Sequence, residues 1–309
     1  MKVIIVGAGL ASAIAVYLIH KKFPLAEIIV YEKNDIGGLM KNDVVNDITI
    51  QLYGPHVFHT TDNNIRDLML EIFKELNINW ETYYIQVLVD VDNKLYTLPY
   101  SKLTGLSKEE YYSKVIEPYT LKQWGNINKD AINRLYELNY YTTHYHGPAT
   151  FSCVFDHNKF FEKIFEYAHV IYKEVTEQDL VNMDADIKIY TGYRENCQFK
   201  YTKFDHQLLN KDLQCYQINT PDITKEYTRI IDFCYMSNKP IQSELHPILY
   251  EIPCKEFDKD GIICYPLGNP NKEYENIVYL GRFGKHKYFD MECVVNDVLT
   301  WFNNFIDKN

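Results

Sequence analysis

Two glycines and a later glutamate near the start of the chain have the types and spacing of a dinucleotide site. Gly7 and Gly9 stand between a short apolar run, residues 2–6, and a segment with helical spacing, residues 10–20. Glycine at such a junction lets the backbone turn tightly and approach a pyrophosphate at the helix N-terminus. Glu32 follows Gly9 by 23 residues, at a point where a carboxylate can hold ribose hydroxyls.

Neighbouring residues modify this pattern in two ways. Ser12 replaces the third glycine of G-x-G-x-x-G, which weakens the pattern but leaves a small residue that still permits close helix packing. The pair Gly37-Gly38 comes shortly after Glu32, as is common in flavin-binding proteins of the Rossmann type. The sequence therefore favours FAD over NAD, and the plain alternative is a glycine turn that binds nothing.

A second segment, YGPHVFHT at residues 53–60, brings two histidines next to a Gly-Pro turn. His56 and His59 can be turn and packing residues, or the Gly-Pro-His turn can bring backbone and imidazole against a flavin ring. A metal site needs further histidine or carboxylate ligands in register. None is evident in the sequence, and no metal is expected.

The elements that must position these residues can be read from hydrophobic spacing. Residues 2–6, 10–20 and 27–31 predict a β-α-β unit, because short apolar runs flank a helical segment. Asp62 is a candidate N-cap for an amphipathic helix over residues 62–77. Short strands are expected at 84–91 and 94–98.

The middle of the chain is predicted to be mainly helical and its end to return to strands. Helices are expected near 107–116, 128–137 and 157–168, interrupted at Pro118 and at Gly147-Pro148. From residue 187 onward strand-like runs are found at 187–191, 227–235, 248–253 and 277–280, and a last helix is expected near 291–306. A strand that ends in Gly281 before a helix is typical of a returning nucleotide-binding domain.

Composition limits the class of protein. The 309 residues suit two packed domains, and 46% hydrophobic with 24% charged residues is close to the globular average. A net charge of −10 without a long Lys/Arg run argues against nucleic acid or an anionic membrane as partner. The 7 cysteines form no C-x-x-C pair, and no signal peptide or membrane span is seen, so a cytoplasmic protein with reduced thiols is expected.

Taken together, the motifs carry a resemblance to the UDP-galactopyranose mutases, flavoenzymes that interconvert the pyranose and furanose forms of UDP-galactose. The motifs occur in the family's order over nearly the whole chain: GAGLASA (7–13), EKNDIGG (32–38), YGPHVFHT (53–60), YTLKQWG (119–125), EYTRIID (226–232) and GRFGKHKYFDM (281–291). The fold class that this resemblance implies is α/β, with a Rossmann-like FAD-binding domain, an inserted and reduced helical domain, and an antiparallel-sheet substrate domain.

The resemblance also implies roles for individual residues. Those expected around the adenosine and pyrophosphate of FAD are Gly7, Gly9, Ala11, Glu32, Lys33 and Leu39, with Leu39 standing where the family usually has Asn. His56 and Val57 are expected to face the isoalloxazine, Arg282 an FAD phosphate, and Asp290 and Met291 the ribityl chain. The cofactor implied is FAD, active when reduced, with NAD(P)H as the reductant.

A second set is implied for a UDP-sugar substrate. Tyr119 matches the tyrosine under the uracil ring, Trp124 the tryptophan near the sugar, and Arg229 the arginine that grips the diphosphate. Tyr265 and Tyr288 match tyrosines whose hydroxyls reach that diphosphate. Guanidinium and phenol donors suit phosphate oxygens without requiring a basic protein. Purely structural roles are the alternative: Tyr119 and Trp124 can be core aromatics, Arg229 a cation on a strand surface and Asp290 an N-cap.

The sequence departs from the family in its helical part. Leu138 stands where the mobile loop of the family carries a phosphate-binding arginine, and Arg134 is nearby but out of register. Val115 and Ile116 replace aromatic residues, and the stretch from Pro99 to Tyr119 is shorter than in the family. Neither the substrate's identity nor the oligomeric state can be carried over from the family.

These expectations assign residues to domains. The FAD-binding domain is expected at 1–80 and 263–309, the sheet or substrate domain at 81–100 and 187–262, and the reduced helical domain at 101–170.

The favoured hypothesis is an FAD-dependent mutase for galactofuranose formation, in which Arg229 and His56 are the candidate catalytic residues and the reaction passes through a covalent flavin N5–sugar intermediate. Two alternatives stay open. One is a non-catalytic relative that binds FAD or a nucleotide sugar, and the other is a flavin oxidoreductase of the amine-oxidase type.

Overall fold

A five-stranded parallel sheet forms the first layer of the molecule. The computed structural model describes residues 1–83, 87–97, 105–125, 150–254, 260–270 and 273–307. The sheet has the order β10-β2-β1-β11-β17, and every neighbouring pair is parallel. Its strands are β1 (Lys2–Val6), β2 (Glu27–Glu32), β10 (His169–Tyr172), β11 (Ile187–Tyr190) and β17 (Val278–Tyr279). The expected β-α-β start is therefore present, and it is joined by strands from distant parts of the chain.

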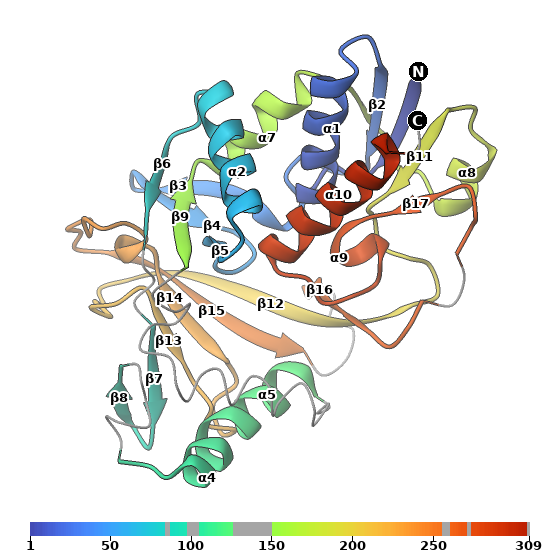
Figure 1. Ribbon diagram of the computed structural model, residues 1–309. Coiled ribbons are helices and arrows are strands. Elements are labelled where there is room, and N and C mark those ends of the chain that lie inside the picture. The colour runs from blue at the N-terminus through green and yellow to red at the C-terminus, as the bar shows by residue number, and fades with distance from the viewer. Residues whose placement is uncertain (84–86, 98–104, 126–149, 255–259, 271–272, 308–309) are drawn as a thin grey trace.

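Helices cover one face of this sheet (Figure 1). They are α1 (Leu10–Lys22), α7 (His157–Phe165) and α10 (Met291–Ile306), and α2 (Asn63–Glu75) packs beside α10. The residues of α1 from Leu10 to Ile19 are all buried, because α1 lies between the sheet, α7 and α10. Asp62 caps α2 as expected, since its side chain accepts hydrogen bonds from the amides of Asn64 and Ile65. The short helix α8 (Glu177–Asn182) packs on the opposite face through Leu180.

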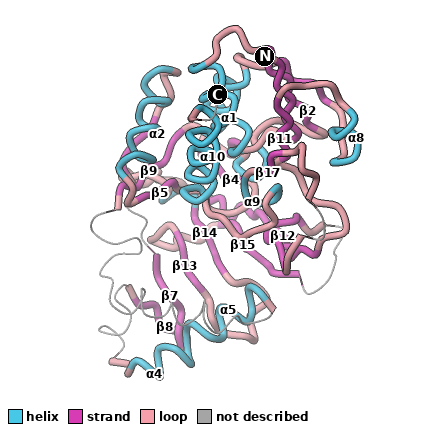
Figure 2. The backbone as a smooth tube through the Cα atoms, turned by 45° about the vertical axis from the view of Figure 1, so that its right-hand side comes forward, coloured by secondary structure: helices cyan, strands magenta, loops and turns pink. Residues whose placement is uncertain are grey.

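A second, mostly antiparallel sheet lies beside this layer (Figures 1 and 2). Its order is β16-β12-β15-β14-β13-β7-β8, and only β13 and β7 pair in parallel. The strands are β7 (Val87–Val91), β8 (Lys94–Tyr96), β12 (Gln198–Leu209), β13 (Gln217–Asn219), β14 (Arg229–Asp232), β15 (His246–Cys254) and β16 (Ile262–Leu267). The short helix η3 (Phe233–Tyr235) follows β14.

Two smaller sheets complete the strands. β3 (Asn42–Val45) and β4 (Ile48–Gln51) form a hairpin, and β9 (Phe151–Phe155) lies between β5 (Phe58–Thr60) and β6 (Trp80–Thr82). Two single-turn helices, η1 (Gly38–Met40) and α9 (Gly281–Gly284), follow strands β2 and β17 of the first sheet.

The helical segment differs from expectation at Pro118. Helix α4 (Lys108–Tyr111) continues through the π-turn η2 (Tyr112–Ile116) into α5 (Glu117–Trp124), so the proline does not break the chain of helical turns. Pro118 lies in the first turn of α5, where a missing amide is tolerated. The preceding π-turn supplies the local widening that a proline ring needs.

The expected helical range 101–170 also differs from the structure in its second half. Helix α7 packs on α1, and β10, which begins at His169, pairs with β2 in the parallel sheet. β11, expected in the substrate sheet, likewise pairs with β1. The helix expected near 128–137 lies outside the described residues. None of the described helices is both long and apolar enough to cross a bilayer.

All seven cysteines lie in the described part of the chain, and no disulfide joins them. A buried polar cluster of Asp232, Cys234 and His246 lies in the seven-stranded sheet, with side chains of metal-ligand type. Its carboxylate accepts hydrogen bonds from the amides of Cys234 and Leu213 and lies 2.8 Å from His246 Nδ1. These contacts satisfy the Asp232 carboxylate, which is also the N-cap of η3. Through Asp232 and His246 the cluster links the end of β14 to the start of β15.

Candidate functional site

The loop from β1 into α1 forms the floor of a cleft. Gly7 has φ +94°, and a Cβ atom there would come within 2.5 Å of Thr191 Oγ1, so only glycine fits. Helix α1 starts at Leu10, and its N-cap Gly9 provides no side-chain cap. The first amides of the helix and the positive end of its dipole therefore form a place for an anionic group.

Ser12, the departure from the glycine pattern, has a structural explanation. Its side chain is fully buried, and its hydroxyl lies 2.9 Å from Thr191 Oγ1. Thr191 Oγ1 in turn donates to the Val6 carbonyl at 2.9 Å. The hydroxyl that replaces the third glycine is thus satisfied by the strand it packs against, and α1 still approaches the sheet closely.

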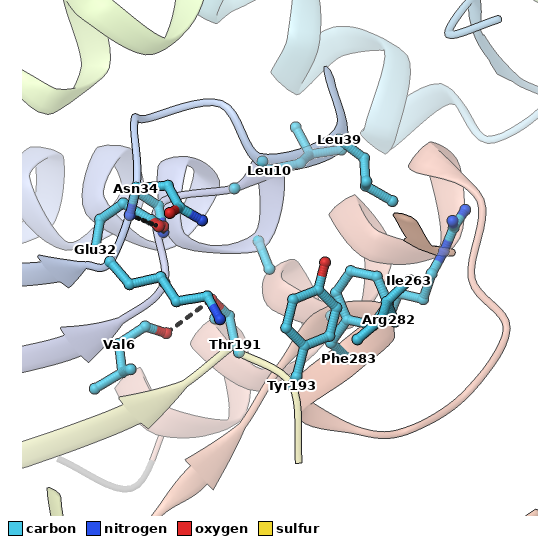
Figure 3. A pocket seen from close by; sticks show the side chains of 18 of the residues that line it. Val6, Leu10, Glu32, Asn34, Leu39, Thr191, Tyr193, Ile263, Arg282 and Phe283 are labelled. Atoms are coloured by element: carbon cyan, nitrogen blue, oxygen red, sulfur yellow. Dashed lines mark hydrogen bonds between the residues drawn. The ribbon is translucent and has the colours of Figure 1, made fainter. Parts of the chain in front are cut away.

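Glu32 ends β2 beside this loop (Figure 3). Its two carboxylate oxygens each accept a backbone hydrogen bond at 2.8 Å, Oε2 from Ala8 and Oε1 from Asn34. These bonds hold the carboxylate in place at the edge of the cleft. Each oxygen keeps a further lone pair, so both can still accept hydrogen bonds from ribose hydroxyls.

The cleft has a volume of about 590 Å³ and runs from the glycine loop to the start of α10. Ten of the residues expected at a cofactor line it, namely Gly7, Gly9, Ala11, Glu32, Lys33, Leu39, His56, Arg282, Asp290 and Met291. Val57 is buried and is not part of the wall. The reason is its position next to β5, where its side chain packs into a core cluster with Tyr83 and Tyr216.

The structure adds cleft residues that the sequence reasoning missed. Tyr193 and Phe283 stand together in the wall with ring centroids 4.3 Å apart (Figure 3). Tyr193 follows β11, and the carboxyl ends of parallel strands are where ligands bind in such sheets. The sequence signal was available, because the strand-like run 187–191 is followed by polar and aromatic residues, but nothing in it assigned that strand to this sheet.

Arg282 is fixed at the far end of the cleft. Gly281, with φ +75°, leaves no room for a Cβ beside Ala11, and its amide donates to Asp297. The Arg282 guanidinium donates to the carbonyls of Phe289 at 2.7 Å and Cys264 at 3.1 Å. Those two bonds orient the side chain along the cleft wall.

Asp290 is both a helix cap and a residue of the cleft wall. It is the N-cap of α10, since its side chain accepts a hydrogen bond from the amide of Cys293 at 2.9 Å. It also lines the cleft. His59 is close by, with Nε2 3.9 Å from Asp290 and Nδ1 3.2 Å from the Val57 carbonyl. The second histidine of the 53–60 segment thus joins that segment to the start of α10.

His56 enters the cleft as a neutral imidazole. Its Nδ1 lies 2.8 Å from the Gly54 carbonyl, so Nδ1 carries the proton and Nε2 is left as an acceptor. Burial, together with the neighbouring His157, Arg282 and Arg229 side chains, lowers its pKa to about 3, although its hydrogen bond to Gly54 acts in the opposite direction. The Arg282 guanidinium thus places positive charge near His56 at the cleft wall, which suits an anionic ligand there.

The two buried histidines predict how stability depends on pH. Burial lowers the pKa of His157 to about 4, compared with about 6.5 for histidine in an unfolded chain. Well above pH 6.5 both histidines are neutral in the folded and in the unfolded chain, so their burial does not lower the free energy of unfolding there. As the pH falls below 6.5, the unfolded chain binds protons that the folded chain does not, which costs about 1.4 kcal/mol per pH unit and per histidine.

We therefore expect the free energy of unfolding to fall between pH 7.5 and pH 5.5, as measured by chemical denaturation. His157→Gln removes one of the two titrating groups, and its loss over this interval should be smaller by about 1.4 kcal/mol. An identical loss in the variant and the parent protein would show that His157 is not buried in its neutral form.

A second group of polar side chains lies on the seven-stranded sheet. Arg229 begins β14 and is opposite Glu251 of β15, and their Nε and Oε2 atoms are 2.7 Å apart. Burial raises the pKa of Glu251, while the charge of Arg229 opposes that shift. Arg229 Nη2 also donates to Tyr265 Oη at 3.4 Å, and Gln123 Nε2 donates to the same oxygen at 3.0 Å. We refer to Gln123, Arg229, Glu251 and Tyr265 as the arginine cluster.

Glu251 connects this cluster to the cleft side of the molecule. A Cβ atom on Gly54, which has φ +91°, would come within 2.5 Å of Glu251 Oε1, so glycine makes room for the carboxylate. Sequence reasoning missed Glu251. Its signal was a single charged residue within the apolar run 248–253, which is unusual for a strand that becomes buried.

Arg282 lies between the cleft and the arginine cluster. Its guanidinium carbon is 5.6 Å from the Tyr265 ring centre and 5.4 Å from that of Tyr288, whose rings are 5.7 Å apart. The structure thus brings Arg229, Tyr265 and Tyr288 together, although none of these three is part of the cleft wall. The cleft and the arginine cluster are therefore adjacent, with Arg282 between them.

The remaining expected substrate residues lie on α5. Tyr119 is partly buried on this helix, and Trp124 is its last residue. Gln123, between them, is the residue whose side chain contacts Tyr265. Tyr119 is not part of the cleft wall. Leu138 and Arg134 lie outside the described residues.

Parts of the chain, or nearly all of it, are similar to known proteins. The family model described as an NAD(P)-binding Rossmann-like domain matches residues 5–75. A probable UDP-galactopyranose mutase of Klebsiella pneumoniae is 22% identical over 377 residues, covering 99% of this chain and 95% of the relative. A dTDP-fucopyranose mutase of Escherichia coli is 21% identical, covering 100% and 99%. A UDP-galactopyranose mutase of Mycoplasma genitalium is 24% identical, covering 95% and 92%.

Solved structures show the same fold. Reduced UDP-galactopyranose mutase superposes with a TM-score of 0.70 at 12% identity, covering 100% of this chain and 96% of that chain. A putrescine oxidase superposes with a TM-score of 0.58 at 9% identity, covering 100% and 99%. The expected Rossmann-like α/β fold and the resemblance to the mutases are thus confirmed.

Proposed function

We propose that the protein is an FAD-dependent isomerase, because the chain resembles nucleotide-sugar pyranose mutases along nearly its whole length. Its substrates are UDP-galactopyranose and UDP-galactofuranose or a closely related nucleotide sugar. The observation that carries this proposal is the meeting of the cleft and the arginine cluster at Arg282. A dinucleotide cleft alone serves many reactions, whereas partly exposed guanidinium and phenol groups beside it suit a second, phosphorylated ligand.

The residues of the cleft fit FAD. The uncapped start of α1 suits a pyrophosphate, and Gly7 and Gly9 allow its close approach. Glu32 is already held where a ribose is expected, at the carboxyl end of β2. Lys33, Leu39, Asp290 and Met291 line the remaining wall. Reduced FAD, with NAD(P)H as its reductant, supplies a nucleophilic nitrogen for the anomeric carbon of the sugar, which the side chains of the site do not offer.

The protein's own groups then act on the sugar nucleotide. The guanidinium of Arg229 and the hydroxyls of Tyr265 and Tyr288 bind the diphosphate and stabilise the charge that develops as UDP leaves. Glu251 holds Arg229 in position through its ion pair. The neutral His56 presents its Nε2 as an acceptor toward the isoalloxazine end of the cleft. Tyr119 and Trp124 on α5 are the proposed contacts for the base and the sugar.

A panel of substrates tests which nucleotide sugar is used. Dithionite-reduced protein is incubated separately with UDP-galactofuranose and with dTDP-fucofuranose, and pyranose formation is followed by chromatography. The proposal expects a yellow protein that converts the first substrate at the higher kcat/KM. Preference for the second substrate would correct the sugar and base but keep the mutase activity. A yellow protein that converts neither would support a binding role, and oxygen consumption with a small amine would support an oxidase.

A further inference from the structure

A buried glutamine holds the loop that carries His56. Gln51 is the last residue of β4 and is 2% exposed. Its Nε2 donates to the His56 carbonyl at 3.0 Å, and the His56 amide donates to its Oε1 at 2.7 Å. The side-chain amide thus pairs with the backbone of His56 as a neighbouring strand would, and it closes the turn through Gly54 and Pro55.

A tyrosine fixes the orientation of that amide. Tyr216 in the loop before β13 is fully buried, and its hydroxyl lies 3.0 Å from Gln51 Oε1, to which it donates. Oε1 therefore accepts two hydrogen bonds, one from His56 and one from Tyr216. Reversal of the amide would place an NH₂ group against both donors, so only one orientation of Gln51 satisfies the network.

The loop held in this way presents functional groups to the cleft. The His56 side chain lines the cleft, while Glu251 Oε1 occupies the space beside Gly54. The turn is thus held by Gln51 at His56 and bounded by Glu251 at Gly54. Gln51 itself does not line the cleft, so it cannot touch a ligand there directly.

We propose that Gln51 is a positioning residue that sets the His56 imidazole and the backbone of residues 54–56 against the isoalloxazine of bound FAD. The inference rests on the proposed function only in that a flavin occupies the cleft. It predicts that the electronic properties of the flavin depend on Gln51, although the two are not in contact. A purely structural glutamine would affect stability and leave the flavin unchanged.

The test compares three variants of the FAD-loaded protein. Gln51→Met keeps the length of the side chain but removes both hydrogen bonds to His56. Tyr216→Phe removes only the donor that orients the amide. Gln217→Met is the matched control, because Gln217 is equally buried at 2% but donates to Asn219 in the same strand. For each protein the flavin content, visible spectrum, midpoint potential and kcat are measured.

We expect Gln51→Met to retain FAD, because the glycine loop and Glu32 are unaffected. Its spectrum and midpoint potential should shift, and kcat should fall by about 10- to 100-fold, the range expected when a reacting group is misplaced by about 1 Å. Tyr216→Phe should shift the same quantities in the same direction by less. Gln217→Met should keep the parent values.

Several outcomes would overturn the inference. Parental spectrum and potential in Gln51→Met, or equal changes in Gln51→Met and Gln217→Met, would reduce Gln51 to a packing residue. If Gln51→Met does not fold, a parental flavin spectrum and midpoint potential in Tyr216→Phe would contradict the inference. A parent protein that holds flavin but isomerises nothing would defeat the proposed function alone, since the spectrum and potential still test Gln51. A parent protein without flavin would defeat both.

Discussion

Arg229→Ala should remove turnover and leave FAD bound. Arg229 is the guanidinium of the arginine cluster, and its loss takes away the charge that stabilises the departing diphosphate. Loss of one such donor costs about 10²–10³-fold in kcat in comparable sites. The cleft wall does not include Arg229, so flavin content should stay at the parent value. Turnover is measured with reduced protein, and flavin content by absorbance after release from the protein.

The control for this substitution concerns Glu251. Removing Arg229 alone leaves a buried carboxylate unpaired, which can destabilise a protein by about 3–5 kcal/mol. The double variant Arg229→Met with Glu251→Gln removes both charges, so it separates loss of catalysis from loss of folding. Arg66→Ala, at an exposed ion pair with Asp67, should behave as the parent. Parental turnover in the folded double variant would remove the role assigned to Arg229.

Gly7→Ala should abolish flavin binding. Gly7 has φ +94°, which an L side chain rarely adopts, and the new Cβ would come within 2.5 Å of Thr191 Oγ1. The loop must shift to relieve this contact, and the shift moves the backbone away from the pyrophosphate position at the start of α1. We expect a colourless protein after purification, and reconstitution with FAD should not restore the yellow form.

The matched control is Gly268→Ala. Gly268 also has a positive φ, +73°, but no atom lies within 4 Å of the position of its added Cβ. It shares the backbone strain of Gly7 without the steric contact, so Gly268→Ala should remain yellow. If Gly7→Ala also keeps a full complement of FAD, the glycine loop is not the pyrophosphate site.

Local features of the fold were predictable from the sequence. The β1–α1–β2 unit, the capped helix α2 and the closing helix α10 all lie where spacing and capping residues placed them. In these elements the signals act over a few residues, because an N-cap or an apolar stripe is read within one or two turns. The prediction that Pro118 breaks the helix was wrong. The π-turn that precedes it cannot be recognised from the residue types of that segment.

Long-range pairing could not be predicted in this way. β10 and β11 look like any other short apolar runs, and only tertiary structure decides that they extend the parallel sheet from residues 169 and 187. The same holds for Tyr193, which becomes a cleft residue because β11 pairs with β1.

The candidate site shows the same division. Motif residues such as Glu32 and Arg282 stand at ends of elements, where the chain order already indicates a ligand, and they line the cleft. Gln51 contacts His56 across the turn between them, and Glu251 contacts Arg229 from the neighbouring strand of the seven-stranded sheet, through side-chain contacts that no motif in the sequence indicates. Val57, expected to face the isoalloxazine, packs its side chain into a core cluster instead of lining the cleft, a direction that its place in the 53–60 motif does not indicate.

The most direct test of the central claim compares one protein preparation in two redox states. Protein with bound flavin is incubated with UDP-galactofuranose, once oxidised and once reduced by dithionite, and the sugar nucleotides are separated by chromatography. A flavin-dependent isomerase should form UDP-galactopyranose only when reduced, over many turnovers, with the flavin still reduced at the end. Equal conversion in both states, or flavin oxidation that keeps pace with substrate loss, would contradict the account.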